Sequence, residues 1–191
     1  MPTPKQPCKN LKDRVTEVEQ NRRFQALVLP HLNAAFNLAR WLARSDQDAE
    51  DVVQEACLRA YKFFDSFQGQ GGRVWLLSIV RNTFYSGSAY RKIQAQCVPF
   101  DESVHDYAGD MDSSASGSPE LALMQRDAAR QLEQALEHLP LEFREVIVLR
   151  ELEDLSYKEI AAIAEIPIGT VMSRLARARK LLAPLLAQEA K

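Results

Sequence analysis

Residues 155–182, LSYKEIAAIAEIPIGTVMSRLARARKLL, decide the fold predicted for the C-terminal half of this chain. Ser156 followed by Glu159 matches a capping box, in which the serine side chain caps a helix and the glutamate reaches back to the serine amide. A helix is therefore predicted to begin near Tyr157. Pro167 has no amide hydrogen and restricts the residue before it, so this helix must stop and a second can start directly after it. The stretch predicts a helix-turn-helix.

The second predicted helix has an apolar face and a basic face. Its apolar residues recur at helical spacing and are expected to face a core; they are Val171, Leu175, Ala178 and Leu182. The opposite face is small, polar or cationic and contains no acid, which suits entry into a major groove and contact with phosphates. An ordinary surface helix with a basic C-terminal half fits the same residues. The candidate DNA-contacting residues are Met172, Ser173, Arg174, Ala176, Arg177 and Lys180.

This stretch resembles region 4 of bacterial sigma factors of the extracytoplasmic-function (ECF) type. The resemblance lies in LSYKEIA, in the pattern P-x-G-T-V and in SRLARAR, and residues 136–156 resemble the lead-in helices of the same region. It implies that the second helix reads the minus-35 promoter element and that the domain contacts the polymerase β flap. In the family, arginine often follows the G-T-V valine and a large residue stands four positions later, whereas this chain has Met172 and Ala176. LuxR-type regulators have a similar helix-turn-helix, so this half alone leaves them open.

The composition favours a soluble cytoplasmic protein with two small domains. The chain has 191 residues, 46% of them hydrophobic, which argues against wholesale disorder. No apolar run approaches the ~20 residues that span a bilayer, and the polar start is not a signal peptide. The three cysteines and three histidines are scattered, so we expect neither a metal site nor a cofactor.

The net charge of −2 is low for a DNA-binding protein, but it is unevenly distributed. Residues 1–93 hold 14 basic and 9 acidic residues (+5), residues 94–118 hold 5 acids and no base (−5), and residues 119–191 hold 10 basic and 12 acidic residues (−2). Phosphate neutralisation dominates nonspecific binding to duplex DNA, so we expect that binding to be weak.

Residues 21–93 predict a first helical domain, preceded by a flexible segment at residues 1–20, of which LKDRVTEVEQ (residues 11–20) could also continue a helix. An apolar helical pattern covers residues 21–43, and Pro30 should kink or split it. Neither an alternating strand pattern nor an Asn-Gly hairpin signal occurs in the sequence. The fold class predicted is all-α, with two small helical domains.

Ser45 opens the next predicted helix, whose acidic first turn suits a helix N-terminus. Its expected buried side is Ala49, Val52, Val53, Ala56, Ala60 and Phe63. The other side presents Leu58 among polar groups, which fits either a small interface centre or a solvated face with one stray leucine. DAEDVVQEACLRAY resembles region 2.2 of the ECF family, which implies docking on the polymerase β′ clamp helices. The polymerase-contacting residues would be Asp51, Gln54, Glu55 and Leu58.

After a glycine-rich loop that lacks the order of a nucleotide-binding motif, residues 73–93 predict another amphipathic helix. Aromatic, amide and guanidinium groups share one face, which suits single-stranded nucleic acid, although Trp75 fits a core position equally well. The stretch resembles regions 2.3 and 2.4, which implies that Asn82 reads a flipped-out base of the minus-10 element and that Trp75, Arg81 and Tyr85 lie around the melted strand. Relatives often continue with arginines, whereas this chain has Ser86, Gly87 and Ser88.

Residues 94–118 predict a flexible acidic linker, and residues 119–188 the second domain. A relaxed 25-residue coil spans roughly 25–30 Å and a stretched one about 80–90 Å. In the family the two domains grip promoter elements about two helical turns apart, roughly 70 Å. We therefore expect a stretched linker when DNA is bound.

The resemblance, which covers about residues 21–93 and 119–186, implies a non-enzymatic transcription initiation factor of the ECF sigma type. Its partners would be core RNA polymerase, promoter DNA and an anti-sigma factor, often membrane-anchored, with no small-molecule substrate. A stand-alone LuxR-type regulator is one alternative, although residues 21–93 lack the strand-helix alternation of a receiver domain. A helical adaptor that sequesters another regulator is the second. An enzyme is disfavoured because the motifs assemble no paired carboxylates, His/Cys dyad or metal cluster.

Overall fold

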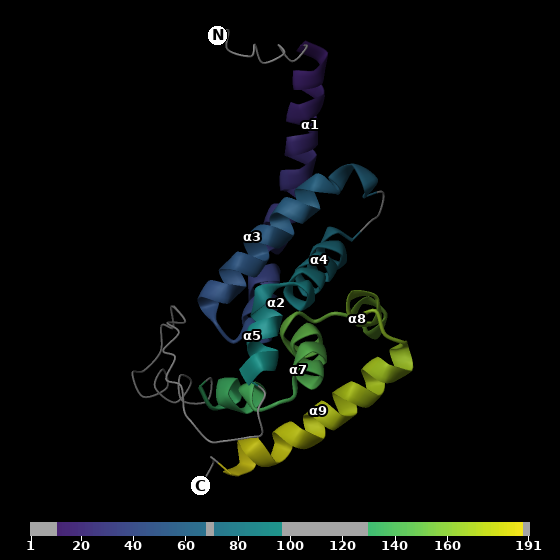
Figure 1. Cartoon of the computed structure of the whole chain (residues 1–191). Coiled ribbons are helices and arrows are strands. Elements are labelled where there is room, and N and C mark those ends of the chain that lie inside the picture. Colours follow the sequence, from purple (N-terminus) through teal and green to yellow (C-terminus); the bar gives the residue numbers. More distant parts are fainter. Residues whose placement is uncertain (1–10, 68–70, 97–129, 189–191) are drawn as a thin grey trace, which may run out of the picture.

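The computed structural model describes residues 11–67, 71–96 and 130–188, and the predicted linker falls almost entirely outside them. The described part of the chain is helical and contains no strand, which confirms the all-α class (Figure 1). The N-terminal half consists of α1 (Leu11–Val28), α2 (Leu32–Ala43), α3 (Asp46–Lys62), α4 (Gly72–Ser86) and α5 (Ser88–Gln96). In the C-terminal half, residues 130–137 are helical and are followed by α7 (Leu141–Ile147), a π-helical turn η3 (Val148–Leu152), α8 (Tyr157–Ala164) and α9 (Ile168–Gln188).

Pro30 divides the first helical pattern, as predicted. α1 ends at Val28, a 3₁₀ turn covers Leu29–His31 and α2 starts at Leu32. The ring of Pro30 removes one backbone donor and blocks continuation of the preceding turn. α2, α3 and α4 pack on one another, with Ala35, Leu38 and Leu42 of α2 fully buried.

α3 begins as the sequence predicts, but its C-terminal end differs. The Ser45 side chain accepts a hydrogen bond from the Asp48 amide at 3.3 Å and so caps the helix. The prediction that Phe63 is buried is wrong, because 56% of its surface is exposed. The helix stops at Lys62, so the chain leaves the helical path and Phe64 takes the core position, with its ring edge-on to Phe24 at 5.4 Å.

The helix-turn-helix forms as its capping residues predict. The Ser156 amide donates to the Glu159 carboxylate at 2.8 Å, and the Glu159 amide donates to the serine hydroxyl at 3.3 Å. These hydrogen bonds hold the pKa of Glu159 below its usual value. α8 ends at Ala164, and α9 starts one residue after Pro167. The four residues predicted to form the inner face of α9 are all buried: Val171, Leu175, Ala178 and Leu182.

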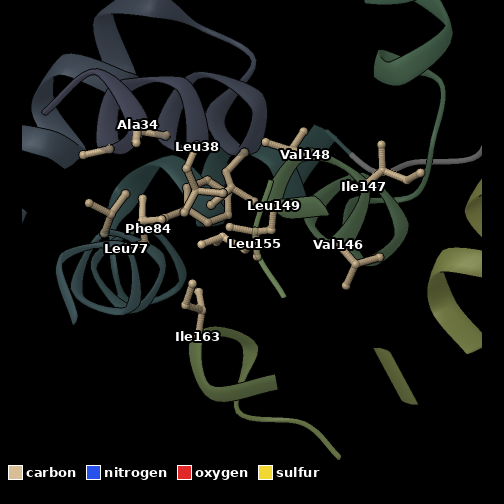
Figure 2. Packing of buried hydrophobic residues seen from close by; sticks show 14 of the residues in the cluster. Ala34, Leu38, Leu77, Phe84, Val146, Ile147, Val148, Leu149, Leu155 and Ile163 are labelled. Carbon is tan, nitrogen blue, oxygen red and sulfur yellow. The ribbon is translucent and has the colours of Figure 1, made fainter. Parts of the chain in front are cut away.

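The two halves of the chain share one hydrophobic core. α7 packs against α2, and α8 packs against α4. Figure 2 shows Leu38 and Phe84 of the N-terminal half in one cluster with Leu149 and Leu155 of the C-terminal half, and each of these four side chains is at most 3% exposed. The sequence predicts two domains, but it does not predict that they pack together in this way.

Candidate nucleic-acid interface

The outward face of α9 is exposed in the described part of the molecule. Ser173, Ala176, Arg177 and Lys180 are exposed, as is half of the Met172 surface. Within the described residues, Arg177 and Lys180 form no ion pair. This face therefore presents two exposed cations and mostly small side chains to the solvent, which is the surface that a major groove can accept.

Arg174 differs from the other candidates on α9. Its guanidinium lies 3.0 Å from the Glu142 carboxylate at the start of α7, and only 23% of its side chain is exposed. On the flank of the helix, Arg179 forms a similar pair with Glu151 at 2.7 Å, which raises the pKa of Arg179. Both pairs hold α9 against the lead-in helices of its own half.

On α4, the structure brings together three of the four side chains expected at the melted strand. The Arg81 guanidinium lies over the Tyr85 ring, 4.6 Å from its centroid, and the Asn82 side chain is next to it. We call Arg81, Asn82 and Tyr85 the α4 polar face. Trp75 lies apart from them, half-buried with its ring centroid 4.5 Å from that of Phe67 and 6.3 Å from that of Phe64. In this conformation Trp75 packs inside the domain.

Carboxylates from the C-terminal half accept hydrogen bonds from the α4 polar face, of which Asn82 remains exposed. Arg81 Nε donates to Glu145 Oε1 at 2.5 Å, and the Tyr85 hydroxyl donates to the other oxygen at 3.3 Å. Asn82 Nδ2 donates to Glu165 Oε1 at 3.1 Å. Burial raises the pKa of Glu145, which is only 1% exposed, and burial together with the Glu145 charge raises the pKa of Tyr85.

The structure contains a second polar cluster, centred on Glu153, that the sequence did not predict. Glu153, which is 4% exposed, accepts hydrogen bonds from Arg73 at 2.5 Å and from Asn37 at 3.3 Å. Glu153 and its donors are 80 and 116 residues apart in sequence, so no local pattern connects them. Arg73 at the start of α4 is thus a further cation of the N-terminal half that a carboxylate of the C-terminal half neutralises.

Arg144 joins the two halves through backbone groups. Its guanidinium donates to the Trp41 carbonyl at the end of α2 at 3.1 Å and to the Leu139 carbonyl at 3.3 Å. Burial, followed by the nearby charge of Arg44, lowers the pKa of Arg144 to about 9. A cation at a helix C-terminus is favoured by the helix dipole, so Arg144 stabilises the contact between α2 and α7.

The candidate polymerase surface on α3 remains uncovered. Leu58 is 68% exposed, and Asp51, Gln54 and Glu55 around it are also exposed. Glu55 forms an ion pair with Arg59 at 2.7 Å, one helical turn away. An exposed pair of this kind contributes little to stability, so Glu55 can exchange Arg59 for another partner.

The described residues hold no group of three or more His, Cys, Asp or Glu side chains placed to bind a metal ion. None of their helices combines the length and apolarity needed to cross a membrane.

Comparisons with known proteins place both halves of the chain in one family. The model of Sigma-70 region 2 matches residues 27–95, and the model of Sigma-70 region 4 matches residues 129–182. The chain is 34% identical to the ECF RNA polymerase sigma-E factor of Escherichia coli over 89% of both chains. It is 33% identical to the RNA polymerase sigma-H factor of Pseudomonas aeruginosa over 86% of this chain and 89% of the relative.

Solved structures of similar chains include a sigma factor with the same fold. The sigma factor RpoE of Bartonella quintana, solved in complex with the anti-sigma factor NepR, is 33% identical, with a TM-score of 0.66 over 87% of this chain and 98% of that one. CnrH, solved in complex with the cytosolic domain of CnrY, is 26% identical, with a TM-score of 0.60 over 92% of this chain and 97% of that one. Two region models in the right order, relatives that match over most of their length and the same fold lead to one conclusion: the chain belongs to the ECF family of RNA polymerase sigma factors.

Proposed function

We propose that this chain is a promoter-recognition subunit that binds core RNA polymerase, recognises minus-35 and minus-10 elements and helps to open the promoter. It contributes no catalytic group of its own and acts in the cytoplasm, where the polymerase and the chromosome are. The observation that carries this proposal is the match of regions 2 and 4 to the two halves of the chain, together with relatives that are similar over nearly their full length.

In this proposal residues 119–188 read the minus-35 element through the outward face of α9. Arg177 lies near the middle of that face and can make a bidentate contact with guanine, whereas Lys180 can serve a phosphate. Met172 and Ala176 offer no hydrogen bond to a base edge, but either can contact a thymine methyl group. Ser173 supplies a hydroxyl, and Arg174 a cation that would first have to leave Glu142.

In the same proposal, residues 21–93 bind the minus-10 element through α4 and the polymerase through α3. Asn82 would read an exposed base edge, Arg81 would contact the strand backbone, and Tyr85 and Trp75 would provide rings for stacking. Leu58 would form the apolar centre of the polymerase contact, with Asp51, Gln54 and Glu55 as its polar rim on the β′ clamp helices. The β flap would contact the C-terminal domain.

Control by an anti-sigma factor is part of the proposal. The similar sigma factor RpoE was solved in complex with the anti-sigma factor NepR, and the similar CnrH was solved in complex with the cytosolic domain of CnrY. An anti-sigma factor anchored in the membrane would receive the inducing signal and release the chain. Purified chain should therefore bind polymerase without responding to metal or oxidant.

The alternatives from the sequence are less favoured. A stand-alone LuxR-type regulator would not account for the region 2 match at residues 27–95. A helical adaptor that never contacts DNA would have no use for an exposed basic face on α9 that contains no acid. Both would also be unexpected in a family of polymerase subunits.

The decisive experiment is copurification with core RNA polymerase followed by run-off transcription from a promoter of the chain's own operon. We expect a stable complex and a transcript that depends on the chain. A double Asp51→Lys, Glu55→Lys variant should lose about tenfold in core binding with unchanged helicity by circular dichroism, because charge reversal at an interface rim costs about 1.4 kcal/mol or more. The matched control is the double Asp46→Lys, Glu50→Lys variant on the first turns of the same helix. Absence of both complex and transcript would refute the proposed function.

A further inference from the structure

The exposed side of α9 changes its chemical character along the helix. The C-terminal part carries the exposed cations Arg177 and Lys180. The N-terminal part instead exposes two large apolar side chains, with 38% of Ile168 and 50% of Met172 open to solvent. Other residues of α9 already fill the core of this half, so the fold does not account for an apolar surface at the start of the helix.

The apolar residues at the start of α9 form a continuous line. Ile168, Met172 and Ala176 are exposed and are spaced four residues apart, so they are neighbours along one side of the helix. We call these three residues the α9 apolar strip. The strip runs along the edge of the outward face that also holds Arg177 and Lys180. It is therefore continuous with the surface proposed to enter the major groove.

The two side-chain donors that follow Met172 on α9 already have partners inside the chain. The Ser173 hydroxyl donates to the Thr170 carbonyl, one turn earlier, at 3.0 Å. The guanidinium of Arg174 lies 3.0 Å from the Glu142 carboxylate. Apolar contact is therefore the main interaction that the strip and its surroundings can offer to a base pair.

Gly169, in the first turn of α9, gives a second observation. It is exposed, its φ is not positive, and a Cβ atom added to it would meet no atom within 4 Å. Neither space nor backbone conformation requires glycine there, although glycine in a helix costs up to about 1 kcal/mol relative to alanine. Glycine suits a place where another molecule approaches the backbone closely. Met172 follows three residues later on the same side of the helix, so that molecule would also contact the strip.

Thymine is the base that matches an apolar strip in the major groove. Its C5 methyl group is the apolar group that base pairs present there, whereas the other three bases present hydrogen-bond donors and acceptors. Burial of a donor or acceptor against an apolar side chain without a partner is unfavourable. An exposed methionine also adapts its shape readily to a neighbouring apolar group. The strip therefore favours thymine and disfavours the other bases.

We infer that the α9 apolar strip reads thymine methyl groups at one end of the minus-35 element, while Arg177 reads the other end. The inference rests on the proposed function of α9. At a rise of 1.5 Å per residue, Met172 and Ile168 lie about 7 and 14 Å before Arg177 along the helix. Since base pairs are 3.4 Å apart, the thymine position should lie about two to four base pairs from the guanine that Arg177 contacts.

The test uses holoenzyme and a promoter library with a randomised minus-35 element, prepared once with thymine and once with uracil in place of every thymine. Uracil pairs with adenine as thymine does but lacks the methyl group. Sequencing of the fragments bound by holoenzyme gives the base preference at each position. We expect a thymine preference at one or two positions that falls about fourfold per methyl group in the uracil library, with the guanine preference of Arg177 unchanged. An equal preference for uracil would overturn the inference and point to DNA shape or hydrogen bonding.

Variants in the same libraries assign the preference to side chains. Met172→Ala should remove most of the thymine preference, and Ile168→Ala should reduce it. Met172→Arg should replace it with a preference for guanine, because arginine donates two hydrogen bonds to that base. Leu181→Ala is the matched control, since Leu181 is an apolar residue of the same helix that is 43% exposed but lies outside the strip. If Ile168→Ala fails to fold by circular dichroism, Met172→Ala decides.

The outcomes separate the strip from the proposed function of α9. A thymine preference that persists in Met172→Ala, or that falls equally in Leu181→Ala, would reject the strip. The proposed function would stand in that case if Arg177→Ala still lost its guanine preference. A wild-type holoenzyme without any minus-35 preference in either library would reject both the strip and the reading of DNA by α9.

Discussion

The two helices proposed to contact DNA, α9 and α4, present their polar faces in opposite states. On α9 the inner face is buried in the C-terminal half, and the outer face, with Arg177 and Lys180, is open to solvent. On α4 the inner face is also buried, but Arg81 and Asn82 on the outer face donate hydrogen bonds to Glu145 and Glu165. The helix that would read duplex DNA is ready to bind, and the helix that would read a single strand is occupied.

This difference corresponds to the order in which the two DNA forms exist. Duplex is present before initiation, whereas a melted strand arises only once the polymerase opens the promoter.

The largest expected effect separates the two faces of α9. Leu175→Ala removes a side chain that is 1% exposed and should lower the free energy of unfolding by about 2–5 kcal/mol, because it leaves a cavity in the core. Arg177→Ala, two residues further on the exposed face, should change stability by less than about 0.5 kcal/mol. Urea unfolding of both variants measures this contrast. Equal losses would mean that the outer face of α9 is structural.

The next effect tests α4. Asn82→Ala should weaken initiation on duplex promoters and discrimination of a single-stranded minus-10 oligonucleotide by about 1–3 kcal/mol, because loss of the amide leaves base edges unpaired. Single-round run-off transcription and oligonucleotide competition with holoenzyme measure it. Asn37→Ala is a suitable control, since it removes an amide that bonds Glu153 without belonging to the α4 polar face. Equal discrimination by the Asn82→Ala holoenzyme would move the base-reading group elsewhere.

An effect of similar size distinguishes base-specific contacts of α9 from its nonspecific electrostatic attraction to phosphates. Arg177→Ala should cost about 1–3 kcal/mol and relax specificity at one or two minus-35 positions. Lys180→Ala should weaken binding by a similar factor for all sequences and flatten the salt dependence. Transcription from promoters with randomised minus-35 elements compares the two variants. Unaltered base preference with Arg177→Ala would make that residue a phosphate contact and leave DNA shape as the basis of recognition.

The smallest expected effect is a pH dependence of the contact between the halves. We call the chain closed when its two halves are packed together and open when they are apart. Glu145 faces Arg81 and Tyr85 of α4 and Arg174 of α9, and burial raises its pKa above the ordinary 4.5 in the closed form. Because the closed form then binds the proton more tightly than the open form, closure is strongest at low pH and weakens as the pH rises from about 4.5 through the raised pKa. Small-angle X-ray scattering across this pH range, applied to wild type and to Glu145→Gln, measures how the radius of gyration changes as the contact weakens. A slope of the same size in Glu145→Gln would assign the effect to another group.

Much of each domain could be predicted from the sequence because its signals are local. The capping box at Ser156, the breaks at Pro30 and Pro167 and the apolar stripe of α9 all act within a few residues, and the structure confirms them. Phe63 shows where a periodic pattern fails. The apolar stripe of α3 would place Phe63 in the core if the helix continued through it, but α3 ends at Lys62. Phe64 enters the core instead.

The sequence by itself thus determined most of the helices, the family resemblance and the outward cations of α9. The prediction of one helix over residues 73–93 was wrong, because the backbone at Gly87 is extended and divides the stretch into α4 and α5. Only the tertiary structure decided that Glu145 would meet Arg81 across 64 positions and that Glu165 would meet Asn82 across 83. Helix capping and periodicity depend on neighbours within one or two turns, and they can be read from the order of residues. A contact between two packed surfaces depends on how whole helices dock, because only docking brings side chains from distant segments within hydrogen-bonding distance and removes the water between them.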